Sequence, residues 1–188
     1  TYSIKSKNCG KGELIIPKDR EIIYDNEFNE CYDYVGPLII PDSIKEIGQY
    51  AFNWCYGLTG SLIIPNSVIE IGDFAFNDCF GFNGSLIIPD SVQRIGKFAF
   101  SSCSKLSGSL IIPDSVQKIG DNVFNGCNCF NGSLYISKSL TEISNNAFSR
   151  CYGLNGSLII PDSVRKIGDY AFNRCHGFIG SLIIPGYV

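Results

Sequence analysis

The chain has 188 residues, of which 45% are hydrophobic and 18% charged, and its formal net charge is −3. This much apolar sequence suffices for a buried core and excludes a largely disordered chain. Lys and Arg are scattered, and the sequence pI is about 5.1, which excludes a nucleic-acid-binding surface built from clustered basic residues.

The N-terminus and the apolar runs bear on membranes and targeting. The longest apolar runs have four to six residues, far fewer than the ~20 that a membrane-spanning helix needs. The first ten residues, TYSIKSKNCG, lack the basic and apolar regions of a signal peptide. The chain does not begin with Met, so a targeting segment can already have been removed. We therefore predict no membrane span and infer no compartment from the ends.

One period organises the whole chain. The Leu that begins the tetrapeptide LIIP, or its variant LYIS, recurs every 24 residues, at Leu14, Leu38, Leu62, Leu86, Leu110, Leu134, Leu158 and Leu182. Such a period is typical of a solenoid, in which each unit buries its apolar face against its neighbours. We predict one domain over 1–188, with a thin N-terminal cap at 1–11, seven repeats from 12 to 179 and a partial terminal repeat at 180–188.

Each repeat begins with a strand. In the sequence SLIIP, Ser109–Ile112 is aliphatic and β-branched, and Pro113 ends it because proline cannot donate to a strand ladder. We expect this strand to stack in parallel on its copies. Side chains alternate along a strand, so Leu110 and Ile112 should point inward and Ile111 outward.

The rest of the repeat returns to the interior. Val116 and Ile119 are expected to bring apolar groups to a second side of the core. The stretch IGDYAFNRC at Ile167–Cys175 places its Ala, Phe and Cys on one face at helical spacing, which predicts a short helical turn. Gly177 fits the left-handed end of that turn.

These residues carry a family resemblance. The pattern at Ile160–Cys175, with Ile-Pro, Ser-Val, Ile-Gly-Asp-Tyr-Ala-Phe and Cys in order, closely resembles the BspA-like class of leucine-rich repeats, and the match runs from Gly12 onward. The resemblance implies an α/β solenoid: a right-handed superhelix with a parallel β-sheet on the concave side and short helical turns on the convex side. Members of the class are often surface or secreted proteins of bacteria and protists, proposed to act in adhesion and in binding host proteins.

The outward strand position is the main candidate for function. It carries Ile in nearly every repeat, whereas a solvated strand face normally carries polar residues, and a contiguous apolar stripe usually marks an interaction site. Tyr135 is the natural centre, because aromatic residues are enriched among binding hot spots. The alternative is that Ile simply favours extended backbone and was copied with the repeat. The candidate binding residues are Ile63, Ile87, Ile111, Tyr135 and Ile159.

Cysteine also recurs with the repeat. Seven of nine Cys share one position, from Cys31 to Cys175, where free Cys is expected to be buried as a small hydrophobe. Parallel side-chain vectors make disulfides between neighbouring repeats difficult. Cys127 and Cys129 are the one close pair, and with a single His in the chain they do not form a familiar zinc site. We predict no metal and no cofactor.

Catalysis finds little support. His176 replaces an aromatic residue of other repeats, while Asp90 and Asp114 follow Pro at repeated turn positions. No phosphate-binding loop or nucleophile elbow is present. We therefore predict that the chain is not an enzyme.

Three Asn-Gly-Ser sequences are candidate glycosylation sites. Their asparagines, Asn83, Asn131 and Asn155, would accept glycans in a eukaryotic secreted protein. The alternative is that they are ordinary turns, in which Asn-Gly is common.

Together these features predict a binding module. We expect non-catalytic protein binding or adhesion through the concave sheet, on a surface or secreted protein, with protein partners of unknown identity. The apolar last strand, SLIIPGYV, predicts end-to-end contacts or a longer parent array. The alternative is a structural component packed within a large assembly such as a cell-wall, cytoskeletal or viral particle. A soluble, glycosylated monomer favours the first, and insolubility outside a complex favours the second.

Overall fold

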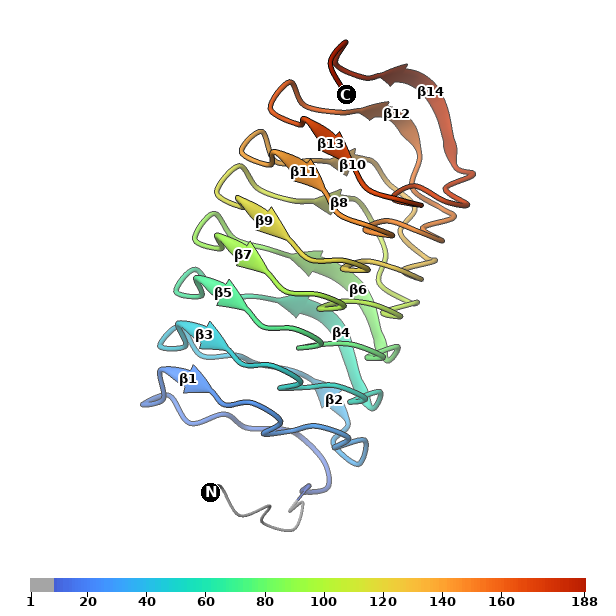
Figure 1. The fold of residues 1–188 in the computed structure, drawn as a ribbon. Helices are drawn as coiled ribbons and strands as arrows, with labels where there is room; N and C mark the ends of the chain where they lie inside the picture. The colour runs from blue at the N-terminus through green and yellow to red at the C-terminus, as the bar shows by residue number, and fades with distance from the viewer. Residues whose placement is uncertain (1–8) are drawn as a thin grey trace.

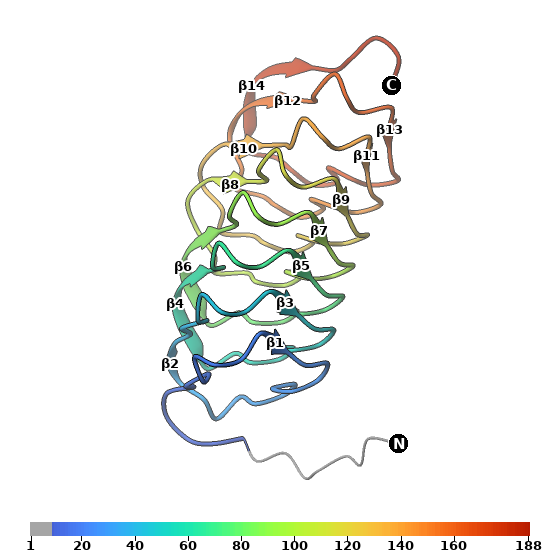
Figure 2. The same ribbon diagram turned by 90° about the vertical axis from the view of Figure 1, so that its left-hand side faces the viewer.

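A computed structural model describes residues 9–188 of the chain, which winds into a stack of parallel coils with its two ends at opposite ends of the stack (Figure 1). Each coil has strands on two sides, and Figure 2 shows these as two rows that run along the stack. The even-numbered row comprises β2 (Gly36–Pro37), β4 (Leu58–Ile63), β6 (Phe82–Ile87), β8 (Leu110–Ile111), β10 (Leu134–Tyr135), β12 (Gly156–Ile159) and β14 (Phe178–Ile183). The odd-numbered row comprises β1 (Ile22–Ile23), β3 (Glu46–Ile47), β5 (Glu70–Ile71), β7 (Arg94–Ile95), β9 (Lys118–Ile119), β11 (Glu142–Ile143) and β13 (Lys166–Ile167).

The even-numbered row confirms the predicted parallel strands. Strands pair in a register of one repeat, as in Leu62 opposite Leu86 in the β4–β6 pair. Within β8 and just beyond it, Leu110 and Ile112 are fully buried, whereas Ile111 is 54% exposed. The alternation of inward and outward side chains is therefore the one expected from the sequence.

The odd-numbered row forms a second parallel sheet that the sequence did not lead us to predict. β1, β3, β5, β7 and β9 join in one five-stranded sheet, and β11 pairs with β13. In each two-residue strand except the last, the second residue, an Ile, is buried in the core; in β13 the Ile is half-buried. The first residue is mostly Glu, Arg or Lys and faces outward. The strands are too short to show alternation in the sequence.

The predicted helical turns are wrong: residues 9–188 contain no helix. The amides of Ala51, Asn53 and Cys55 donate to carbonyls three residues earlier, while those of Tyr50, Phe52 and Trp54 donate to the next coil at 2.7–2.9 Å. A helix would keep all of these amides within the segment. The segment is instead a series of tight turns, in which Tyr50 and Trp54 adopt a left-handed backbone. The prediction that Gly177 ends a helix in a left-handed conformation is also wrong, because Gly177 does not have a positive φ angle.

A ladder of phenylalanine rings runs through the core behind these turns. The rings stack from coil to coil with centroids 5.1–5.8 Å apart and nearly parallel planes. Its members are Phe28, Phe52, Phe76, Phe100, Phe124, Phe148 and Phe172. One phenylalanine ring per coil thus packs against its copies in the adjacent coils.

The two ends of the stack differ in burial. Leu14 in the first coil is 4% exposed, whereas Leu182 at the equivalent position of the last coil is 63% exposed. Of the predicted cap at 1–11, residues 1–8 lie outside the described residues, and Cys9 packs against the first coil. Within residues 9–188, the first coil is therefore more completely buried than the last.

Candidate functional site

The outward column of the even-numbered row forms a continuous apolar surface, which we call the Ile stripe. Each member lies on a strand or beside one, and each is between 39% and 71% exposed. Adjacent members are one coil apart, about 4.8 Å along the stack. The stripe comprises Ile39, Ile63, Ile87, Ile111, Tyr135, Ile159 and Ile183. All five candidate binding residues predicted from the sequence are therefore brought together on one exposed surface.

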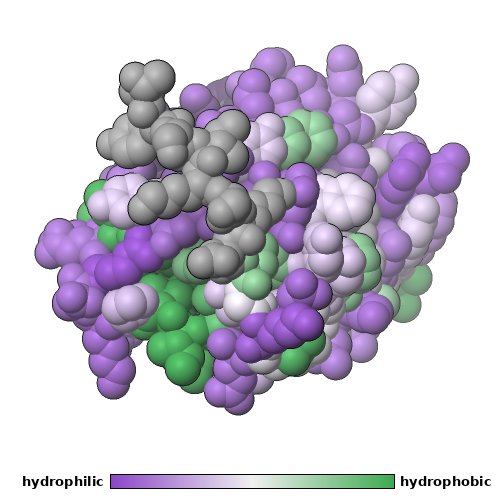
Figure 3. Space-filling model, turned by 90° about the horizontal axis from the view of Figure 1, so that it is seen from below, coloured by the Kyte–Doolittle hydropathy of each residue, from purple (hydrophilic) through white to green (hydrophobic). Residues whose placement is uncertain are grey.

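The apolar surface reaches the N-terminal end of the stack. Figure 3 looks along the stack from below and shows a compact green apolar area bordered by purple hydrophilic side chains. Ile15, which pairs with Ile39 through an isolated bridge, is 81% exposed at this end. The stripe thus continues into the first coil.

Small polar residues border the stripe on one side. A column of serines precedes it, and the hydroxyl oxygens of Ser61 and Ser109 accept the amides of Ser85 and Ser133 at 3.1 and 3.2 Å. These hydroxyls bind backbone groups of the next coil, so the serine column stabilises the stacking of the coils.

The three candidate glycosylation sites lie beyond the serines. Asn83 is within β6, and its side-chain oxygen accepts the amide of Gly60 at 3.0 Å. Asn131 accepts the amide of Gly108 in the same way at 2.9 Å, whereas the side-chain nitrogen of Asn155 donates to the carbonyl of Asn131. Asn83 therefore lies on an extended strand and not in a turn. Glycosylation of the three asparagines stays a prediction.

Acidic residues border the other side of the stripe. One residue beyond the Pro position, four coils carry an exposed Asp, and we call Asp42, Asp90, Asp114 and Asp162 the acidic rim. The hydroxyl of Tyr135 donates to both carboxylate oxygens of Asp114 at 3.0 and 3.1 Å. A side chain of the stripe therefore reaches the rim directly.

The Asp114 carboxylate is the only rim member with partners in the described residues. The Lys138 amide donates to it at 2.8 Å. This backbone hydrogen bond, together with that from Tyr135, lowers the pKa of Asp114 below its ordinary value. The other three carboxylates make no hydrogen bond or ion pair within residues 9–188.

The repeated cysteines have a structural role. Each thiol donates to the carbonyl of a Phe in the preceding coil, as in Cys55 to Phe28 at 2.9 Å and Cys103 to Phe76 at 3.1 Å. Burial raises the pKa of the Cys55 thiol to about 12 and that of Cys175 to about 11. The predicted burial of the column is confirmed.

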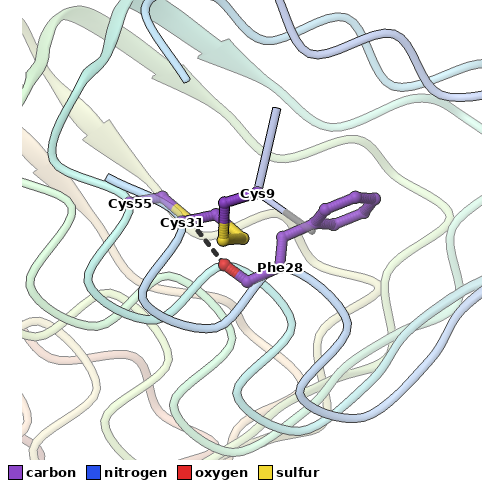
Figure 4. The surroundings of a disulfide bond; sticks show 4 residues. All are labelled: Cys9, Phe28, Cys31 and Cys55. Atoms are coloured by element: carbon purple, nitrogen blue, oxygen red, sulfur yellow. Dashed lines mark hydrogen bonds between the residues drawn. A yellow bond between two sulfur atoms is a disulfide. The ribbon is translucent and has the colours of Figure 1, made fainter. Parts of the chain in front are cut away.

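A disulfide closes this column at its N-terminal end (Figure 4). Cys9 bonds to Cys31, and the pair lies next to the Phe28 carbonyl that accepts the Cys55 thiol. The sequence analysis argued that cysteines of neighbouring repeats would not form disulfides, and within the described residues they do not. It did not predict the bond to Cys9, which lies outside the Cys column.

These thiols should differ sharply in reactivity. Seven are free, and Cys129 is the only exposed one among residues 9–188. At pH 8 we expect Cys129 to react with Ellman's reagent within minutes, while the five buried column thiols react only on unfolding, because they are buried and protonated. The half-buried Cys175 should react more slowly than Cys129. The absorbance change without and with denaturant measures this. Two or more fast thiols would mean that the column is open to solvent.

No metal site appears in the part of the chain that the structure describes. The lone His176 stacks on Tyr152 at 6.0 Å, as a variant of an aromatic position. Residues 9–188 contain no group of three or more His, Cys, Asp or Glu placed to hold a metal ion. They also contain no helix with the length and apolar character to span a membrane.

The geometry defines a class of protein: a parallel β-solenoid with 24-residue coils and strands on two sides of each coil. Its sequence matches the family model "BspA type Leucine rich repeat region" over residues 21–155 and 80–187. The chain belongs to the BspA-type leucine-rich repeat family, whose repeats generally act as protein-interaction or adhesion modules.

Solved structures agree with this assignment. A leucine-rich repeat protein of T. pallidum superposes with a TM-score of 0.77 and 26% identity, over 90% of this chain and 78% of that one. A leucine-rich cell surface protein of Faecalibacterium prausnitzii gives 0.73 and 27%, over 90% of this chain and 47% of that one. A leucine-rich repeat protein of Eubacterium ventriosum, at 15% identity and 0.59, covers 86% of this chain and 57% of that one, and shows the fold alone. The comparison with curated proteins gives no match.

Proposed function

We propose that the chain is a single non-catalytic domain for protein binding and adhesion, which binds through the Ile stripe on its concave side. The observation that carries the proposal is the exposed ladder of aliphatic side chains. Repetition for packing accounts for Leu110 and Ile112, which are fully buried, but not for Ile111, which is 54% exposed. A contiguous apolar surface of this kind usually marks an interaction site.

We further propose that the chain belongs to a surface or secreted protein. The Cys9–Cys31 disulfide supports an oxidising compartment, because such bonds persist outside the cytosol. The superposed Faecalibacterium protein is described as a cell surface protein, which supports the same location.

Substitution of the stripe tests the proposal. The triple variant Ile87→Ser, Ile111→Ser and Tyr135→Ser should keep its fold, because these side chains face outward and contribute little to the core. Its affinity should fall by about 100-fold or more: this corresponds to about 2.7 kcal/mol, and truncation of a single hot-spot residue already costs at least about 2 kcal/mol. Biolayer interferometry would measure this on purified extracellular proteins that bind the wild type.

A matched control separates the stripe from general hydrophobicity. Ile69 is 48% exposed on another side of the coil, and Ile69→Ser should leave binding unchanged. Equal binding by the triple variant would contradict the proposal. Loss of its fold would mean that the stripe residues support the core.

A second candidate function, a structural component of a larger assembly, is favoured by the exposed apolar residues of the last described coil. They include Ile179, which is 88% exposed, and Leu182, which is 63% exposed. Light scattering with chromatography on residues 1–188 distinguishes the two functions. A stable monomer favours the binding module, whereas filaments favour end-to-end contacts or a longer array.

A further inference from the structure

The charges around the Ile stripe point to the chemistry of its occupant. The outward positions of the even-numbered row carry no charge from Pro37 to Ile183. The positions two and four residues before each stripe residue hold mainly Ser, Asn and Thr. Beyond the Pro position, the acidic rim contributes four carboxylates, and Lys18 and Lys138 two cations; the opposite edge carries one acid and one base, Asp33 and Lys105. The excess of carboxylates therefore lies on the Pro side of the stripe.

Three of the four members of the acidic rim, Asp42, Asp90 and Asp162, form no ion pair within residues 9–188, unlike several charged residues of the odd-numbered row. On the odd-numbered row, three acid–base pairs join adjacent coils: Lys45 pairs with Glu21 at 2.9 Å, Arg94 pairs with Glu70, and Lys166 pairs with Glu142 at 2.6 Å. No such ion pair engages Asp42, Asp90 or Asp162 within residues 9–188. Their charge is therefore available to a partner.

The rim and the stripe are close enough to contact one ligand. The hydroxyl of Tyr135, a member of the stripe, reaches Asp114 at 3.0 Å. Near the N-terminal end, an open hollow of about 500 Å³ is lined by Ile39, Pro41 and Asp42, and also by Lys18 of the preceding coil. An aliphatic side chain on the stripe and a cation at the rim can thus belong to the same bound segment.

We propose that the stripe binds an amphipathic, positively charged polypeptide segment, whose aliphatic side chains cover the isoleucines and whose Lys or Arg residues pair with the acidic rim. The inference rests on the proposed binding function and deepens it by naming the partner's chemistry. An acidic partner would be repelled, since like charges at an interface suppress binding. From Ile39 to Ile183 the stripe spans six coil spacings, about 29 Å, which matches a helix of about 19 residues.

Two helical 18-residue peptides test the inference. Both carry the same leucine face, and one has lysines and the other glutamates on its polar face. We expect the lysine peptide to bind about tenfold more tightly by fluorescence anisotropy at 50 mM salt, as expected for two or three exposed ion pairs. The preference should shrink at 500 mM salt, because salt screens exposed charges.

Variants of the acidic rim test whether its carboxylates cause the preference for the lysine peptide. The double variant Asp90→Asn with Asp162→Asn should lose most of the difference in affinity between the two peptides. The fold accepts Asn at this position, because Asn66 already occupies it in another coil. The matched control is Asp33→Asn with Asp169→Asn, which makes the same charge change at exposed acids outside the rim. It should leave the preference intact.

The outcomes separate this inference from the proposed function. Equal affinity for the two peptides, no binding of either, or an equal effect of the control pair would overturn the inference. The proposed function would still stand if the triple stripe variant lost its extracellular ligand. If that variant bound both that ligand and the lysine peptide like the wild type, both proposals would fail.

Discussion

Replacing Phe100 with Ala should lower the free energy of unfolding by about 3–5 kcal/mol, the cost typical of removing a buried phenyl ring. The ring is fully buried and stacks between Phe76 at 5.5 Å and Phe124 at 5.4 Å. A cavity there would weaken two interfaces between coils. Because solenoid stability depends on contacts between neighbouring coils, the urea transition should also broaden as the two halves begin to unfold separately. Circular dichroism during urea titration measures both effects.

Phe98→Ala is the matched control for that experiment. Phe98 stacks on Phe74 at 4.7 Å in a second aromatic ladder two residues away, but it is only half-buried. We expect this change to cost less than half as much as Phe100→Ala. Equal losses would contradict the view that the inner ladder holds the coils together.

The sequence predicted the core well because the core is the repeated part. A 24-residue period places identical side chains opposite each other, so the direction of Leu110, Ile111 and Ile112 followed from alternation along one strand. The Phe and Cys columns followed for the same reason. One strand per repeat was sufficient to predict the Ile stripe.

The turns were mispredicted because side-chain spacing alone does not distinguish helix from turn. Ala171, Phe172 and Cys175 have helical spacing, yet the backbone beside them takes a left-handed conformation at Tyr170 and Arg174. Tight turns of this kind are stabilised by hydrogen bonds between coils, as in Phe148 to Ala171 at 2.8 Å. Such bonds join residues that are 23 positions apart, so no short stretch of the sequence reveals them.

Two other features depend on departures from the repeat. The Cys9–Cys31 disulfide involves Cys9, which lies before the first strand and outside the 24-residue Cys column. The repeat pattern therefore did not predict its partner. The sequence showed the acidic rim as turn-forming Asp residues after Pro. Only the structure showed that Asp42, Asp90 and Asp162 form no ion pair within residues 9–188, while acids of the odd-numbered row do. Both required the positions of residues in adjacent coils.

Glycine at one position of the repeat explains why the strands differ in length. The strands that follow Gly57, Gly81 and Gly177 have six residues, and the one that follows Gly153 has four. Where the position holds Asp33, Lys105 or Cys129, the next strand has two. A Cβ on any of the four glycines would lie closer than 3.0 Å to carbonyl oxygens of the preceding coil. Glycine thus permits the close approach that lets pairing begin early.

Gly81→Ala should therefore destabilise the fold by about 2–3 kcal/mol, because the added methyl group overlaps the carbonyl oxygens of Tyr56 and Leu58. The backbone of Phe82 and Asn83 must move away, which shortens β6 to its last residues. Hydrogen exchange should show lost protection at the start of β6 and unchanged protection at Leu86. Cys129→Ala is the control, since that coil already accommodates a Cβ, and it should change stability by less than about 0.5 kcal/mol. If Gly81→Ala were as stable as wild type, close approach of the coils would not determine strand length, and the short β8 and β10 would need another cause.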